Sequence, residues 1–157
     1  MNYRHLIIAA IIAFATAGSA VACTKPAGAS GLQSELVGWI NAQRKAKGLS
    51  ALTTSGKLTA AAQGHACDMA GRGYFSHQRS GGPDLPRRLK QNGYGFRTVV
   101  ENIAKTGAPD VGRVGTIWRK SGEHWKNLMN PKVRDIGIGV ATGGGQVYWV
   151  MNAGVTH

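Results

Sequence analysis

The stretch IGIGVATGGGQVYWVMNAGV, residues 136–155, decides the fold because it has the pattern of a β-hairpin. In its first half, isoleucine and valine alternate with Gly137 and Gly139, which is the two-residue period of a strand with two different faces. Three glycines at 143–145 form a turn signal, and a second extended segment follows. Because glycine has no side chain, we expect a helix to lie close to the glycine face of the hairpin.

Four segments ahead of the hairpin carry helical spacing and capping signals. We predict helices that begin at Ser30, Ser55, Pro83-Asp84 and Asp110. The first three end near Gly48, Gly71 and Asn92, and the fourth includes Trp118 on its core-facing side. One more strand is predicted around residues 97–100. Helices early in the chain and strands late in it predict an α/β domain in which helices cover a small, mainly antiparallel sheet.

The first twenty-two residues have the composition of a signal peptide. Arg4 precedes an apolar run at 6–15, and small residues follow it. The run is shorter than the roughly 20 apolar residues that a membrane span needs. Cleavage fits after Ala20 or Ala22, and we expect a secreted or periplasmic protein with no transmembrane span after cleavage.

Export places the chain in an oxidising compartment, where its only two cysteines, Cys23 and Cys67, are expected to form a disulfide. The alternative is a lipoprotein acylated on Cys23, because the preceding residues loosely resemble a lipobox. The usual leucine three positions before the cysteine is Ala20 here, and acylation would leave Cys67 unpaired.

Composition narrows the class of protein. The formal net charge is +12, and 43% of the residues are hydrophobic, so the chain can bury the core of one globular domain. The basic residues are spread along the chain instead of being clustered with aromatic residues, which disfavours a specific nucleic-acid groove. The positive charge would still attract anionic lipid headgroups or cell-envelope polymers.

Three titratable residues are the candidates for chemistry. Two imidazoles, His77 and His124, and one carboxylate, Glu101, suit zinc binding or proton transfer if the fold brings them together. As separate residues, the histidines also fit ordinary polar loop positions. His65 and Asp68 stand three apart on one predicted helix, so a structural hydrogen bond between them is the favoured interpretation.

Six phrases in the chain support a more specific hypothesis. They are LVGWINAQRKAKGL (36–49), HACDMA (65–70), YFSH (74–77), ENIA (101–104), WRKSGEHWKNL (118–128) and IGIGVA (136–141). In this order they resemble the CAP superfamily, also called the SCP or PR-1-like domain and related to allergen V5/Tpx-1 proteins, in its bacterial secreted branch. The resemblance divides the chain into a signal peptide (1–22), an N-terminal segment (23–31) and a CAP domain (32–155).

The resemblance implies a three-layer α-β-α sandwich with a central cleft lined by two histidines and two acidic residues. His77 and His124 match the histidines, and Glu101 matches one acid. The position of the second acid falls on Ser121, and Glu123 is the candidate replacement. Asn102, which follows Glu101 in its motif, is expected to be structural, as are His65 and Asp68.

Two classes of function follow from the resemblance. The first is a secreted binding module whose cleft residues His77, Glu101, Ser121 and His124 hold a lipid or a cell-envelope component. In it, His77, Glu101 and His124 would bind Zn²⁺ or another divalent metal. The alternative is a metal-dependent, peptidase-like hydrolase with those three residues as catalytic candidates. No recognisable nucleophile motif is present, which favours binding.

Overall fold

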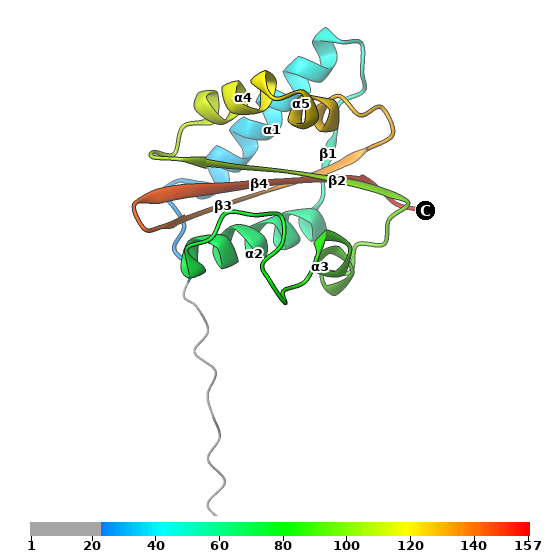
Figure 1. Ribbon diagram of the computed structural model, residues 1–157. Coiled ribbons are helices and arrows are strands. Elements are labelled where there is room, and N and C mark those ends of the chain that lie inside the picture. Colours follow the sequence, from blue (N-terminus) through cyan, green and yellow to red (C-terminus); the bar gives the residue numbers. More distant parts are fainter. Residues whose placement is uncertain (1–22) are drawn as a thin grey trace, which may run out of the picture.

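The computed structural model describes residues 23–157, and the predicted signal peptide at 1–22 lies outside the described residues. A four-stranded sheet lies between two helical layers (Figure 1). The helices are α1 (Ala29–Ala46), α2 (Gly56–Arg72), α3 (Leu85–Gln91), α4 (Val111–Lys120) and α5 (Gly122–Leu128). The strands are β1 (Thr53–Thr54), β2 (Thr98–Thr106), β3 (Asp135–Gly143) and β4 (Gln146–Val155). Helices α1, α4 and α5 cover one face and α2 and α3 the other, which confirms the predicted sandwich.

The sheet has the strand order β1-β3-β4-β2. Strands β3 and β4 form the predicted hairpin, and Gly144 and Gly145 turn it with φ of 56° and 72°. Strand β2 pairs with β4 in antiparallel fashion over nine residues, so it is much longer than the predicted 97–100. Polar residues in its second half hide its strand character from the sequence pattern. Two residues of β1 pair with β3 in parallel.

Three of the four predicted helix starts are confirmed by capping hydrogen bonds. Ser55 Oγ accepts from Leu58 N at 3.4 Å, and Asp84 and Asp110 each cap their helix at 2.9 Å. The prediction for Ser30 is wrong, because it lies inside α1. The cap position is Gly28, whose φ of 68° lets the chain turn sharply into the helix.

Strand β3 presents very different surfaces to the two layers. Ile136, Ile138 and the other large residues on one side are buried against α1 and α4. On the other side, a Cβ atom added at Gly137 or Gly139 would collide with the backbone of α2. The expected close approach of a helix to the glycine face is therefore confirmed, and that helix is α2.

A disulfide joins Cys23 to Cys67 and thereby ties the N-terminal segment to α2, as predicted. It closes a loop with a sequence separation of 44, which contributes about 4 kcal/mol in the chain-entropy model. Over residues 23–157, no helix combines the length and the apolar character that crossing a membrane requires.

Candidate functional site

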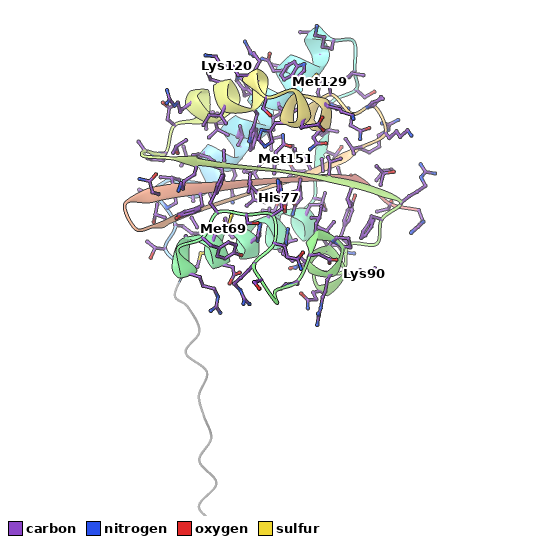
Figure 2. All side chains as sticks on the ribbon, viewed as in Figure 1. Met69, His77, Lys90, Lys120, Met129 and Met151 are labelled. Atoms are coloured by element: carbon purple, nitrogen blue, oxygen red, sulfur yellow. A yellow bond between two sulfur atoms is a disulfide. The ribbon has the colours of Figure 1, made fainter. Side chains whose placement is uncertain are left out.

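The candidate cleft lies at the free edge of the sheet, along β2. A cavity of about 490 Å³ opens there, with His77 from the segment after α2 and His124 from α5 in its wall. These residues come from opposite sides of the sheet, since α5 belongs to one helical layer and the segment after α2 to the other (Figure 1; Figure 2 labels His77). The fold therefore brings the two predicted histidines to one cavity.

Glu101 lies on β2 behind His77, and its side chain is only 3% exposed. His77 Nδ1 lies 2.9 Å from Oε1, and Arg88 Nη2 donates to Oε2 at 2.7 Å. The Asn152 amide, in the orientation that satisfies its neighbours, also donates to Oε2 at 2.9 Å. Both carboxylate oxygens thus accept hydrogen bonds from N–H donors. Glu101 contributes to the cleft by orienting the imidazole of His77.

Arg88 and Asn152 are site residues that the sequence reasoning missed, and Arg88 was counted among the scattered surface cations. Arg88 is buried, and its Nη1 also donates to the carbonyls of His77 at 3.0 Å and Pro83 at 2.9 Å. The sequence does contain one indication that Arg88 is buried. In the short third helix it stands three residues after Leu85 and next to Leu89, so it lies on the apolar side of the helix.

His124 has a buried Nδ1 with no hydrogen-bond partner in the described structure. Burial lowers the pKa of this imidazole, and the nearby His77 lowers it further. His124 is therefore neutral at neutral pH. Its backbone carbonyl accepts a hydrogen bond from Asn102 Nδ2 at 2.9 Å, and Asn127 Nδ2 donates to Asn102 Oδ1 at 2.9 Å. Asn102 thereby ties β2 to α5.

His65 and Asp68 do not make the hydrogen bond that their spacing predicted. His65 Nε2 donates to the carbonyl of Ser76 at 3.0 Å, whereas Asp68 accepts from Arg72 Nε at 2.7 Å and from the hydroxyl of Tyr74. Each side chain has a better placed partner in the segment that follows α2. Together these bonds hold that segment, and with it His77, against the helix.

Ser121 and Glu123 stand apart from this cluster. Ser121 is the residue between α4 and α5, and it does not line the cavity that His77 and His124 share. Glu123 is exposed in the first turn of α5. Within residues 23–157, no group of three His, Cys, Asp or Glu side chains lies close enough together to hold a metal ion.

The model of the CAP, or cysteine-rich secretory protein, family matches residues 37–153. The chain belongs to the CAP family. A curated relative, the uncharacterized protein YkwD of Bacillus subtilis, is 32% identical over 119 residues. The match covers 76% of this chain and 46% of the relative, so the chain spans about half the length of that protein.

Solved structures of other bacterial proteins have the same fold. An extracellular protein with an SCP domain from Bacillus anthracis is 27% identical, with a TM-score of 0.73 over 80% of this chain and 41% of that one. An outer surface protein from Borrelia burgdorferi has a TM-score of 0.77 over 87% of this chain and all of that one, at 21% identity. The disulfide of this chain is consistent with an extracytoplasmic CAP protein.

In the cleft of this CAP domain, the side-chain atoms available to a ligand are histidine nitrogens and not carboxylate oxygens. Since Nδ1 of His77 bonds to Glu101, its Nε2 remains for a ligand, and the side chain is 57% exposed. His124 lines the same cavity, and its buried Nδ1 has no hydrogen-bond partner in the described structure. Two imidazole nitrogens fit a divalent metal such as Zn²⁺, whereas Glu101 has no free oxygen to offer it.

Proposed function

We propose that this CAP domain is a secreted binding module whose edge cleft captures a ligand through His77 and His124. The observation that supports binding over catalysis is the state of Glu101. Both of its oxygens accept hydrogen bonds from N–H groups, and one of the donors is the buried guanidinium of Arg88. A carboxylate held in this way orients His77 and is poorly placed to act as a general base.

A divalent metal is the proposed link between the two histidines and the ligand. His77 Nε2 and a ring nitrogen of His124 would hold it, and the ligand and solvent would complete its coordination. A bound Zn²⁺ would supply Lewis acidity for a polar or anionic head group. Glu101 would set the tautomer of His77, as a carboxylate commonly does behind a histidine ligand.

The apolar wall of the same cavity supports an amphiphilic ligand, such as a lipid or an acylated envelope component. Ile103, Ala104 and Ile117 line it, together with Phe75, which is 45% exposed. Lys105 Nζ lies 5.5 Å from the centre of the Phe75 ring. An acyl chain along this wall would place an anionic head group within reach of Lys105 and the histidines.

The hydrolase alternative has weaker support from the described residues. It needs a nucleophile beside His77 or a free base, and the candidate Ser121 does not line the cavity. If His77→Ala abolished a hydrolytic activity of the purified protein and left the fold intact, the binding-only proposal would fail.

Calorimetric titration of the oxidised protein with zinc chloride tests the metal site at about pH 7.5, where ordinary imidazoles are neutral. We expect saturable one-site binding that is lost in His77→Ala and in His124→Ala. His157→Ala, which removes an exposed histidine at the C-terminus, should bind zinc like the unmodified protein. Binding that survives in both cleft variants would refute the metal site.

Titration with dodecanoate tests the apolar wall separately. Ile117→Glu should weaken binding at least tenfold, because it places a charge in that wall. Thr116→Glu adds the same charge at the neighbouring exposed position and should leave the affinity within twofold. Equal affinities in the two variants would exclude an acyl chain from this cavity, whatever the zinc result.

A further inference from the structure

A surface hollow of about 480 Å³ lies at the end of the sheet opposite the turn that joins β3 to β4 (Figure 1). It is found where the start of β2 meets the loop between α5 and β3. Five residues form its wall, namely Arg97, Thr98, Pro131, Lys132 and Arg134. Three of them are exposed cations, and we call this surface the basic hollow. Neither His77 nor His124 lines it, so it is separate from the edge cleft.

The three cations of the basic hollow, Arg97, Lys132 and Arg134, have no acidic partner. None of them takes part in the ion pairs found in the part of the chain that the structure describes. Asp135 follows Arg134 in the chain, but it does not line the hollow, and its Oδ2 accepts from the hydroxyl of Tyr94 at 2.7 Å. The wall therefore carries a positive charge that no side chain in it balances.

A buried arginine fixes the loop that carries Lys132 and Arg134. Arg44 is 1% exposed, and its Nη1 donates to the carbonyls of Leu128 at 2.8 Å and Asn130 at 3.0 Å. Asn130 Oδ1 in turn accepts from the backbone N–H of Lys132 at 2.9 Å. The backbone of the loop is thus held in place before any partner binds, which reduces the entropy lost on binding.

The guanidinium of Arg134 is oriented by the same loop. Its Nη1 donates to the carbonyls of Pro131 at 2.6 Å and Val133 at 2.9 Å. Its Nε and Nη2 donate to no group within the described residues, and this edge of a guanidinium can bind an oxyanion through two parallel hydrogen bonds. Burial lowers the pKa of Arg44, and the nearby charge of Arg134 lowers it further. A fourth cation therefore lies behind the wall of the basic hollow.

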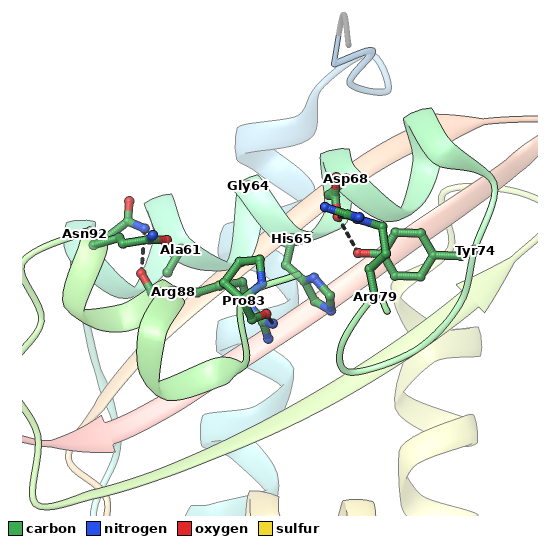
Figure 3. A pocket seen from close by; sticks show the side chains of 10 residues that line it. Ala61, Gly64, His65, Asp68, Tyr74, Arg79, Pro83, Arg88 and Asn92 are labelled. Carbon is green, nitrogen blue, oxygen red and sulfur yellow. Dashed lines mark hydrogen bonds and ion pairs between the residues drawn. The ribbon is translucent and has the colours of Figure 1, made fainter. Parts of the chain in front are cut away.

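The cavity between α2 and α3 shows the opposite arrangement of charge (Figure 3). Arg79 and Arg88 line it, but so does Asp68, next to the hydroxyl of Tyr74 in Figure 3. Arg79 Nε lies 3.6 Å from Asp68 Oδ2, and Arg88 forms an ion pair with Glu101. Each arginine of that cavity thus has an acidic partner, whereas the cations of the basic hollow have none.

We propose that the basic hollow binds a flexible polyanion that carries repeating phosphate groups. A phosphate group has oxygens in several directions, so one group can accept hydrogen bonds from more than one of the three cations. A single ion binds weakly to exposed cations, because solvent and salt screen the attraction. A chain of phosphates gains more, because its binding releases several counterions at once.

The surroundings of the basic hollow favour a soluble polymer over a lipid bilayer. Segments that dock on bilayers commonly insert aromatic or aliphatic side chains among the head groups. Among residues 23–157, Phe75 is the only exposed large hydrophobic residue, and it lines the edge cleft. The basic hollow therefore offers charge without an apolar anchor. This proposal does not depend on the function proposed for the edge cleft.

The test is calorimetric titration of the oxidised protein with inorganic polyphosphate, in low salt and with a chelator that removes divalent metals. The double variant Arg97→Gln, Lys132→Gln removes two of the three charges. Neither side chain makes a hydrogen bond within the described structure, so the fold should be kept, which urea unfolding checks. The matched control is Arg113→Gln, Lys120→Gln, because both residues are exposed on α4 and do not line the hollow.

We expect saturable binding of polyphosphate that is weakened at least tenfold in Arg97→Gln, Lys132→Gln and less than twofold in the control. The slope of log affinity against log salt concentration should fall by about two in the first variant, because about one counterion is released for each contact between a cation and a phosphate. Orthophosphate at the same total phosphate concentration should not saturate the protein.

Four outcomes would overturn the proposal. They are absence of polyphosphate binding, equal losses in the two double variants, orthophosphate binding as tight as that of polyphosphate, and equal or tighter binding of polyglutamate. The second would mean diffuse attraction, the third a site for a single ion and the fourth a preference for carboxylates. Tighter binding to phosphatidylglycerol vesicles than to polyphosphate would assign the surface to a bilayer and refute the polymer as well.

One further measurement keeps this result separate from the metal site. Polyphosphate should bind to the His77→Ala, His124→Ala double variant within twofold of its affinity for the unmodified protein. Failure to bind zinc together with intact polyphosphate binding would refute only the metal site of the edge cleft. Intact zinc binding without polyphosphate binding would refute only the function of the basic hollow.

Discussion

The two faces of the sheet are built on different physical principles. Between the sheet and helices α1, α4 and α5, large side chains are packed together, including Trp118 of α4 and Trp149 of β4, which are both fully buried. On the other face, Gly137 and Gly139 of β3 pack against α2, which has alanines on this side. The backbones of the strand and the helix are therefore in close contact. The first face gains stability from buried apolar area, and the second depends on steric fit.

This difference explains where the polar groups can lie. On the large-residue face, the indole N–H groups are satisfied within the core, for example Trp118 Nε1 by the carbonyl of Ile103 at 3.1 Å. On the α2 side, His65, Arg88 and Glu101 form a buried polar cluster between the helices and the edge strand. The face on which strand β3 presents glycines is therefore the one that holds the buried polar cluster.

The largest predicted effect comes from breaking the buried ion pair on the α2 side. Arg88→Met leaves the carboxylate of Glu101 without its cation, and we expect the free energy of unfolding in urea to fall by about 3–5 kcal/mol. Arg87→Met on the same helix should change it by less than about 0.5 kcal/mol, because its side chain is exposed. Similar losses for the two variants would mean that the cluster adds nothing specific to this face.

Adding one methyl group to the glycine side of β3 should have the next largest effect. In Gly139→Ala the new Cβ meets the backbone of Ala62, which cannot rotate away, so we expect a loss of about 3 kcal/mol. Gly38→Ala, at an exposed position within α1, should instead stabilise by about 0.5–1 kcal/mol. Thermal unfolding of both variants checks the sign as well as the size.

Removing one methyl group from the opposite side of the same strand should cost less. Ile138 is buried in the large-residue core, and Ile138→Val is expected to lower the free energy of unfolding by about 1 kcal/mol. Ile138→Val and Gly139→Ala lie at adjacent positions of β3. The first removes one carbon atom from a side chain, and the second adds one. If Ile138→Val proved costlier than Gly139→Ala, the contrast between area and steric fit would be wrong.

A further effect depends on pH and concerns the buried His65. Burial lowers the pKa of this imidazole in the folded state. As the pH falls below about 6.5, the ordinary pKa of histidine, the unfolded chain binds a proton that folded His65 does not. Stability is therefore present above that pH and is lost as the pH falls toward the lowered folded pKa, with a slope of at most about 1.4 kcal/mol per pH unit for one proton.

His65→Gln tests this prediction, because the glutamine amide can still donate to the carbonyl of Ser76. Urea unfolding between about pH 7 and pH 5 should show a shallower loss of stability in this variant. The lowered pKa of His124 acts in the same direction, so part of the slope should remain. His157→Gln, at the exposed C-terminus, is the control, and an identical slope in His65→Gln and the unmodified protein would contradict the assignment.

Sequence reasoning succeeded where the signal is local. The alternation of Gly137 and Gly139 with large residues predicted both the hairpin and the close helix, and Ser55, Asp84 and Asp110 cap helices as predicted. It failed at Ser30, because a glycine in the left-handed conformation starts α1 two residues earlier. At each of these helix starts, the interactions that fix the start lie within a few residues of it in the sequence.

The site required long-range information. The residue types of His77, Glu101 and His124 marked them as candidates, and the family motifs strengthened that choice. Their geometry, however, depends on Arg88, a residue that looks in the sequence like any surface arginine. Its burial follows from the packing of α3 against α2 and β2, which no local pattern records.

By itself, the sequence determined the family, the hairpin, most helix ends and the pairing of the only two cysteines. Only the tertiary structure decided that His77 and His124 share a cavity and that Arg88 and His77 engage Glu101. The physical reason is that periodicity and capping act over a few residues. A buried charge, by contrast, is neutralised and hydrogen-bonded by groups that are distant in the sequence and that only the packing of the layers places beside it.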